Sequence, residues 1–228
     1  MSKPNTFENQ LLLHIFQNAA IALIGDASGL QPSATAGSLY VSLHTADPGE
    51  AGDQTSNETA YTNYARVAVA RTSGGWTVSS NQVSNTAAIN FAQCGATGAD
   101  ITHWGIGTAS SSTGKLLYKG PLGSALQGPF TAKTDDTITI PGHALSVGDR
   151  VSFYPLPGAS LPTGITEGTI YWVKTVSGND ITISTTSGGT TVDITAVGSG
   201  FAIKSAVLSV SNGITPSFAI GALVVTED

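Results

Sequence analysis

Positively charged side chains are scarce in this chain of 228 residues, which has nine Lys plus Arg, fifteen Asp plus Glu and a formal net charge of −6. Contacts with phosphates require clustered cations, and no such cluster occurs along the sequence. We therefore expect neither nucleic acid nor an anionic membrane surface as a direct partner. Charged residues of both signs make up only 11%, against about 25% in an average soluble protein, which suits close packing against other subunits.

Cysteine and long apolar runs are also nearly absent. The single cysteine, Cys94, excludes an internal disulfide. Its surroundings, FAQCGATG, supply no base or cation to activate a thiol, so we expect a buried structural thiol. No apolar run reaches the roughly 18 residues of a membrane-spanning helix, and no signal peptide led by Lys or Arg is seen. We therefore expect a protein made in the cytoplasm of its host.

One segment has the pattern of an amphipathic helix, residues 6–24, with the sequence TFENQLLLHIFQNAAIALI. Thr6 or Asn5 can cap its start, and Gly25 is expected to end it. His14 has no second potential ligand one turn away, so it is interpreted as a packed helix histidine. The apolar residues with helical spacing are Leu12, Ile15, Phe16, Ala19, Ala20 and Leu23.

The rest of the chain alternates between strand formers and turn residues, which is typical of an all-β protein. The final run predicts a strand, a turn at Asn212-Gly213, and a second strand broken at Gly221. Earlier strands are expected at 39–45, 65–72, 76–80, 88–92, 101–109 and 115–120.

In residues 128–203 the strand-like runs are short and closely spaced, and SGND and SGG turns join them. We interpret them as a small β-barrel-like module inserted into a base domain formed by residues 1–127 and 204–228. The expected fold class is mainly β, with a sandwich-like or barrel-like base domain, one N-terminal helix and this inserted module.

The segment at residues 43–58, LHTADPGEAGDQTSNE, raises the question of a metal or acid/base site. Metal ligands must converge, and Pro48, Gly49 and Gly52 prevent the helix that would align them. The residue order of an EF-hand loop is absent. We interpret the segment as a turn at 47–50 and a solvated loop, with calcium binding left open. Its candidate ligands are His44, Asp47, Glu50, Asp53 and Glu58.

Motifs of catalysis are missing elsewhere too, including a G-x-S-x-G elbow, a P-loop and H-E-x-x-H. His103, beside Trp104 in a strand, is expected to pack at a subunit contact, and His143 to bond nearby backbone. We therefore expect no enzyme, no catalytic residue, no cofactor and no metal. A hydrolase of cell wall or capsule is the alternative, and it would draw on Asp47, Glu50 and His103.

Aromatic residues of the inserted module are candidates for stacking on sugar rings. Tyr171 and Trp172 are adjacent in a strand and must face opposite ways, so one of them is expected in the core. Tyr154 is the third aromatic candidate. The residues proposed as partner contacts are Leu12, Ile15, Phe16, Trp104, Tyr154 and Trp172.

Two long stretches, SLHTADPGEAGDQTSNETAYTNYARVAVAR and INFAQCGATGADITHWGIGTASSSTGKLLYKGPL, resemble a family of tailed-bacteriophage virion proteins, as does the closing NGITP. Members of that family are labelled tail fibre, capsid decoration or minor capsid protein. The resemblance covers residues 6–127 and 204–228, and the module between them is similar to a small β unit that recurs in phage structural proteins. The family carries no known catalytic set, so the resemblance implies no active site.

The resemblance implies a virion structural protein on the particle exterior. Our first expectation is a capsid decoration or minor capsid protein that cements the shell, pairing with itself as a dimer or trimer and with the major capsid protein or other virion proteins. The N-terminal helix would supply an anchoring contact. The alternative is a tail fibre or tail-tip adhesin whose inserted module contacts host surface glycan. Copy number separates the two.

Overall fold

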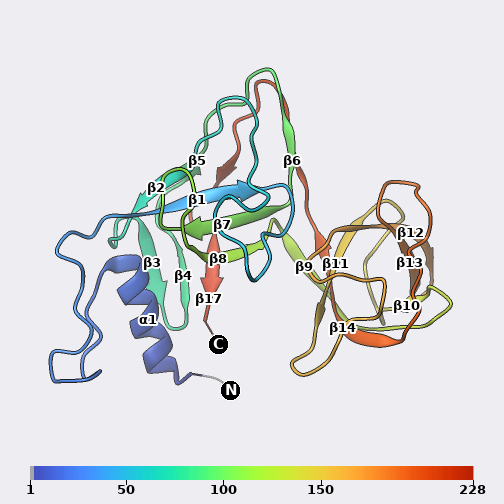
Figure 1. The fold of residues 1–228 in the computed structure, drawn as a ribbon, viewed down its shortest axis with the longest axis horizontal. Helices are drawn as coiled ribbons and strands as arrows, with labels where there is room; N and C mark the ends of the chain where they lie inside the picture. The colour runs from blue at the N-terminus through green and yellow to red at the C-terminus, as the bar shows by residue number, and fades with distance from the viewer. Residues whose placement is uncertain (1–2, 228) are drawn as a thin grey trace.

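The computed structural model describes residues 3–227 and is mainly β, which confirms the expected fold class. Figure 1 shows a base, which contains the helix and both chain ends, and a barrel set to one side of it. The chain passes from the base into the barrel once and returns once.

Helix α1 (Asn5–Gln17) is shorter than the expected span 6–24. Pro4 is its N-cap and no side chain caps it, so neither Asn5 nor Thr6 has that role. Asn18 ends the helix in a left-handed conformation with φ 55°, which a short polar side chain tolerates. Within residues 3–227, no helix has both the length and the apolar character to cross a membrane.

The base is built from antiparallel strand pairings around one four-stranded sheet in the order β2-β1-β7-β8. The strands of its first part are β1 (Ser38–His44), β2 (Val67–Ala70), β3 (Trp76–Ser79), β4 (Gln82–Asn85), β5 (Ile89–Asn90), β6 (Ala99–Ile101), β7 (His103–Gly107) and β8 (Leu116–Pro121). After the barrel, the chain returns as β15 (Leu208–Val210), β16 (Ser217–Phe218) and β17 (Val224–Thr226).

The C-terminal strands complete sheets begun early in the chain, because β15 pairs with β6, β16 with β5 and β17 with β4. The turn at Asn212-Gly213 is present, but the strands beside it pair with distant segments and not with each other. Gly221, with φ 72°, separates β16 from β17 as expected. Strands β4 and β6 were not expected, because QVSN and ADI each hold too few strand formers to stand out.

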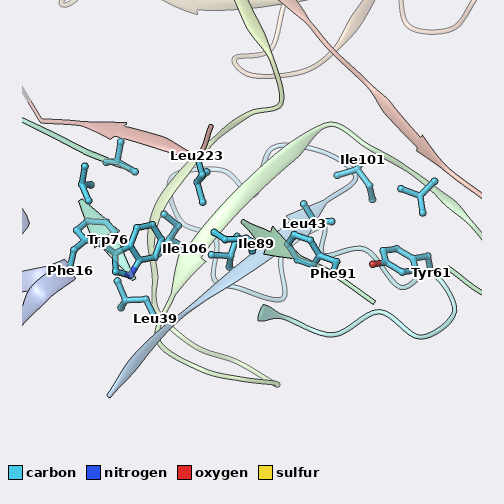
Figure 2. Close-up of a cluster of buried hydrophobic side chains, with 14 of the residues drawn as sticks. Phe16, Leu39, Leu43, Tyr61, Trp76, Ile89, Phe91, Ile101, Ile106 and Leu223 are labelled. Carbon is cyan, nitrogen blue, oxygen red and sulfur yellow. The ribbon is translucent and has the colours of Figure 1, made fainter. Parts of the chain in front are cut away.

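The core of the base joins the helix to the sheets. Phe16 of α1 meets Trp76 of β3 edge to face, with ring centroids 4.8 Å apart. Figure 2 shows this pair at one end of the cluster and Phe91 with Tyr61 at the other, with aliphatic side chains between them. Aromatic contacts of this geometry add to the stabilisation from burial itself.

The barrel is closed, with strand order β10-β13-β12-β11-β14-β9, which confirms the small barrel expected in this part of the chain. It has its own buried cluster, in which the rings of Phe130 and Phe153 lie 4.9 Å apart edge to face. Closure gives each of its strands a hydrogen-bonded partner on both sides. Its strands are β9 (Ser124–Ala132), β10 (Ile138–Thr139), β11 (Arg150–Pro155), β12 (Tyr171–Ser177), β13 (Asp180–Ser184) and β14 (Gly198–Ser205).

The two connections to the barrel lie side by side. Strands β9 and β14 pair along their whole length, from Ser124 opposite Ser205 to Ala132 opposite Gly198. Just outside them, the backbone N–H of Ala206 donates to the carbonyl of Leu122 at 3.1 Å. The barrel therefore leaves and rejoins the base at a single point, which is the geometry of an inserted module.

Candidate functional site

The segment 43–58 is attached to the sheet and is not the freely solvated loop that we expected. His44 is fully buried, and its Nδ1 lies 2.9 Å from the carbonyl oxygen of Ser56. Gln54 is also fully buried, and its side-chain oxygen accepts from the backbone N–H of Ala109 at 2.8 Å. These long-range contacts were invisible to local sequence patterns.

The carboxylates of this segment are divided among different partners, and two of them share Lys119. Asp47 lies 2.9 Å from the ammonium of Lys119, and Glu50 contacts the same ammonium at 3.0 Å. Asp53 accepts from the backbone N–H and hydroxyl of Thr55. Glu58 instead meets Arg66 in two contacts of 2.7 Å. Among residues 3–227, no three His, Cys, Asp or Glu side chains converge as metal ligands would.

The backbone of Gly49 and the ammonium of Lys119 together keep Asp47 ionised. Burial by itself would raise the pKa of Asp47, but the backbone N–H of Gly49 and the ammonium of Lys119 outweigh it and lower the pKa. Burial correspondingly lowers the pKa of Lys119, but Asp47 and Glu50 outweigh it and raise the pKa. Both groups are therefore charged at neutral pH and form an ion pair.

Ser42 and His44 resemble part of a hydrolase site but are fully buried. Because the carbonyl of Ser56 can only accept, Nδ1 of His44 carries the proton and Nε2 accepts from the Ser42 hydroxyl at 2.8 Å. Burial lowers the pKa of His44. A β-carbon at Gly105 would lie 2.7 Å from both Nε2 and the Ser42 oxygen, so the pair fills a close-packed sheet face.

His103 lies opposite His44 on β7, and only 1% of it is exposed. Its Nδ1 is 2.9 Å from the hydroxyl of Thr102, and its buried Nε2 has no hydrogen-bond partner among residues 3–227. Burial lowers the pKa of His103 to about 4. We expected this residue at a contact between subunits, but it is covered within a single chain.

The surface between base and barrel, here called the junction, combines a cleft and an ion pair. The cleft is about 210 Å³ in volume and is lined by Asp47, His103, Lys119, Gly120, Pro121, Tyr154 and Ile203. Beside it, Arg150 of β11 lies 3.8 Å from Asp100 of β6. Asp100 also accepts from the hydroxyl of Ser209 at 2.6 Å. The ion pair links the barrel to the base.

Two of the three aromatic residues considered for sugar stacking, Tyr154 and Trp172, lie near this junction. Tyr154 lines the cleft, and burial raises its pKa. Trp172 lies under the guanidinium of Arg150, which is 4.2 Å from the ring centroid. Tyr171 is buried in the barrel core, as expected for one member of its pair with Trp172. One face of Trp172 is thus already covered by the chain itself.

The apolar residues proposed as partner contacts lie mainly in the chain's own core. Leu12 and Phe16 are fully buried, so they offer no surface to a partner. Ile15 and Trp104 are partly buried and pack against the same cluster. The helix residues are covered because α1 packs its apolar face against strands β3 and β4. We had expected that same face to contact a partner.

The remaining sequence candidates have local structural contacts. Cys94 is buried and unpaired, and its sulfur approaches the carbonyls of Gly95 and Thr97. His143 accepts from the backbone N–H of Leu145 at 3.0 Å, as expected. The Nδ1 of His14 lies 2.7 Å from the carbonyl of Ala19.

Two arginines that were not considered from the sequence organise the base. Arg66 pairs with Glu58 and also donates to the carbonyl groups of Ala109 and Ser112. Arg71 donates to the carbonyls of His14 and Ile15 at 2.7 and 2.6 Å, where it neutralises the negative end of the helix dipole. The sequence offered one reason to single them out: the chain has only nine Lys plus Arg, so each cation is rare.

Comparison with known proteins places the chain in a phage fibre family. The family described as Podophage GP4 fiber I protein gp80 matches residues 3–148, which include the whole first part of the base and the start of the barrel. No curated protein matches the chain. The match supports a virion structural protein and does not support the capsid decoration family that we first expected. The chain belongs to the Podophage GP4 fiber I protein gp80 family.

Proposed function

We propose that this chain is a component of the tail fibre of a podophage virion, and that its barrel contacts the host surface. The observation that carries the proposal is the family match over residues 3–148, since that family is described as a fibre protein. The match favours our alternative expectation, the fibre, over a capsid decoration protein.

The junction supports a role in which the barrel is presented in a defined direction. The ion pair of Asp47 and Lys119 lies on the base side of the cleft, and Tyr154 closes it from the barrel. A β-carbon at Gly168 of the barrel would lie 2.1 Å from the Asp47 carboxylate, so the two parts are in close contact there. A rigid mount limits the entropy that is lost when the barrel engages a surface.

Strands β10, β12 and β13 lie on the side of the barrel away from the base (Figure 1), and their polar side chains suit a polar partner. Here the hydroxyl oxygens of Thr175 and Thr182 lie 2.7 Å apart on neighbouring strands and are exposed. Thr139 bonds Asp180, and Lys174 bonds Thr191. Hydroxyl, carboxylate and ammonium groups match the donors and acceptors of host surface glycan. We call these six residues the distal face.

We also propose that the chain transforms no substrate and contacts neither nucleic acid nor membrane. The polar groups with catalytic potential are engaged with one another, as in the pair of Ser42 and His44. The net charge of −6 opposes binding to phosphates. The partners in this proposal are other virion proteins on the base side and the host surface on the barrel side.

The experiment that tests the fibre proposal is imaging of intact virions with an antibody fragment against the barrel. We expect labels only on tail appendages and in few copies. Labels spread over the head in hundreds of copies would contradict the proposal and would instead indicate a capsid decoration protein. Absence of the chain from purified virions would contradict both.

A further inference from the structure

An ordered hairpin at residues 18–33 projects from the base beside α1, where the dark blue chain leaves the helix in Figure 1. Three sets of contacts hold its shape. At its root, the side chain of Asn18 bonds the backbone of Ser33 in both directions, at 2.8 and 3.0 Å. Midway, Ile21 and Leu30 exchange two backbone hydrogen bonds. At its tip, Asp26 accepts from two backbone N–H groups, those of Ser28 and Gly29.

This hairpin carries apolar side chains into solvent. Leu23 is 81% exposed, Leu30 45% and Ile24 39%. Leu23 also has φ 66°, a left-handed conformation that is unusual for a bulky residue. Strain of this kind persists where the surrounding structure enforces it, and it gathers at functional positions. An ordered segment that exposes leucines and holds one under strain is better explained by a contact outside the chain.

A groove suited to such side chains lies at the root of the hairpin. It has a volume of about 430 Å³. Its apolar walls come from Ile15, Leu39 and Leu117, and the chain at Ser33–Ser38 forms one side. No residue of the segment 19–32 lines this groove, so the hairpin does not fill the groove of its own chain.

Charge also matches between the hairpin and the groove. Arg71 lines the groove and bonds only carbonyls and the Ser33 hydroxyl, so among residues 3–227 it has no carboxylate partner. Asp26 is the one charged residue of the hairpin, and it bonds only backbone N–H groups in that part of the chain. The Arg71 guanidinium at the groove, which otherwise contacts helix and loop carbonyls and one hydroxyl, and the Asp26 carboxylate at the hairpin tip are thus groups of opposite charge.

We propose that the hairpin of one copy docks its leucines into the groove of a second copy of this chain. Because hairpin and groove lie on the same side of the molecule, a symmetric assembly makes the contact reciprocally. The inference goes beyond the proposed function, because it concerns a contact between copies of this chain. It does not depend on where the protein lies on the virion.

The test is sedimentation equilibrium of the full-length chain with matched variants. Leu23→Asn replaces the apolar side chain with a residue that tolerates the left-handed conformation, so we expect the variant to fold as the wild type does. Burying a leucine is worth roughly tenfold or more in an association constant. We expect Leu23→Asn and the groove variant Leu117→Ser each to weaken self-association by about that factor.

Two further variants make the result specific. Val197→Asn removes an equally exposed apolar side chain, 72% exposed, from the barrel and should leave association unchanged. Asp26→Asn keeps the acceptor of the tip turn and removes its charge, so it should weaken association at low salt only. A wild type that stays monomeric at its highest soluble concentration overturns the proposal. So does unchanged association of Leu23→Asn, or an equal loss in Val197→Asn.

Discussion

His44 and His103 stand directly opposite each other on β1 and β7, and both are buried. Burial lowers the pKa of each, that of His103 to about 4. The folded state therefore prefers both rings neutral, whereas the unfolded chain protonates them near pH 6.5. Stability from this pair is fully present above about pH 6.5 and is lost as pH falls from there through about 4.

The first prediction follows from that relationship. His103→Asn keeps an acceptor for the Thr102 hydroxyl and cannot be protonated. We expect the variant to lose less free energy of unfolding between pH 7.5 and 4.5 than the wild type, by up to roughly 3 kcal/mol. Urea unfolding followed by tryptophan fluorescence measures the difference at the two pH values. Equal losses in both proteins would contradict the role assigned to His103.

The second prediction concerns the ion pair of Glu58 and Arg66. The Arg66 side chain is 3% exposed and that of Glu58 16%, so removing the carboxylate leaves a guanidinium buried with too few acceptors. We expect Glu58→Gln to lower the free energy of unfolding by about 2–4 kcal/mol. Glu50→Gln is the matched control, because Glu50 is 85% exposed and should change stability by under about 0.5 kcal/mol. Similar effects of the two would refute this assignment.

The third prediction is that the barrel and the base fold separately. Ala206 and Leu122 are already hydrogen-bonded, so residues 124–205 can be replaced by a short glycine linker without moving the base. We expect the shortened chain to unfold cooperatively, because the core around Phe16 and Trp76 contains no barrel residue. Circular dichroism melting and NMR dispersion measure this. A chain without the barrel that stays unfolded would show that the two cores depend on each other.

The fourth prediction concerns Arg150, which covers Trp172 and reaches Asp100. Arg150→Ala uncovers the indole ring, so tryptophan emission should shift to longer wavelength, with a loss of about 0.5–1 kcal/mol of stability. Asp100→Asn keeps the stacking and removes the charge, so it should leave the emission unchanged. An unchanged spectrum in Arg150→Ala would mean that the guanidinium does not shield Trp172.

The fifth prediction tests the distal face in the assembled virion. Thr175→Val with Thr182→Val removes two hydroxyls and keeps the branched shape of both side chains. We expect slower adsorption to host cells with normal incorporation into particles. The control is the matching pair Thr77→Val with Thr86→Val on the base, whose hydroxyls lie 2.9 Å apart and are also exposed. Normal adsorption of the barrel variant would remove the distal face from the proposed host contact.

Local patterns predicted the fold class well and the element boundaries less well. Alternation and turn residues identified most strands, and the alternation rule correctly required one of Tyr171 and Trp172 in the core. The helix was expected to run to residue 24 because its apolar spacing continues, but Asn18 adopts a left-handed conformation and ends it. Strand β6 depends on pairing with β15, more than 100 residues later in the chain, so its own three residues do not identify it.

The candidate site was harder to predict, because its contacts are long-range. Asp47 finds Lys119 at a separation of 72 residues, and Gln54 finds Ala109 at 55. From composition alone, this acidic segment fits a solvated loop as well as it fits a segment packed on the sheet. Only its distant partners distinguish the two.

The sequence by itself determined a mainly β chain with one helix, one small barrel and few cations, because these properties depend on composition and on the spacing of neighbouring residues. The tertiary structure alone decided that His103 and Tyr154 meet at an internal junction, and that Leu23 projects while Phe16 is buried. Burial and charge pairing depend on distances between residues that are far apart in the chain, and only folding sets those distances.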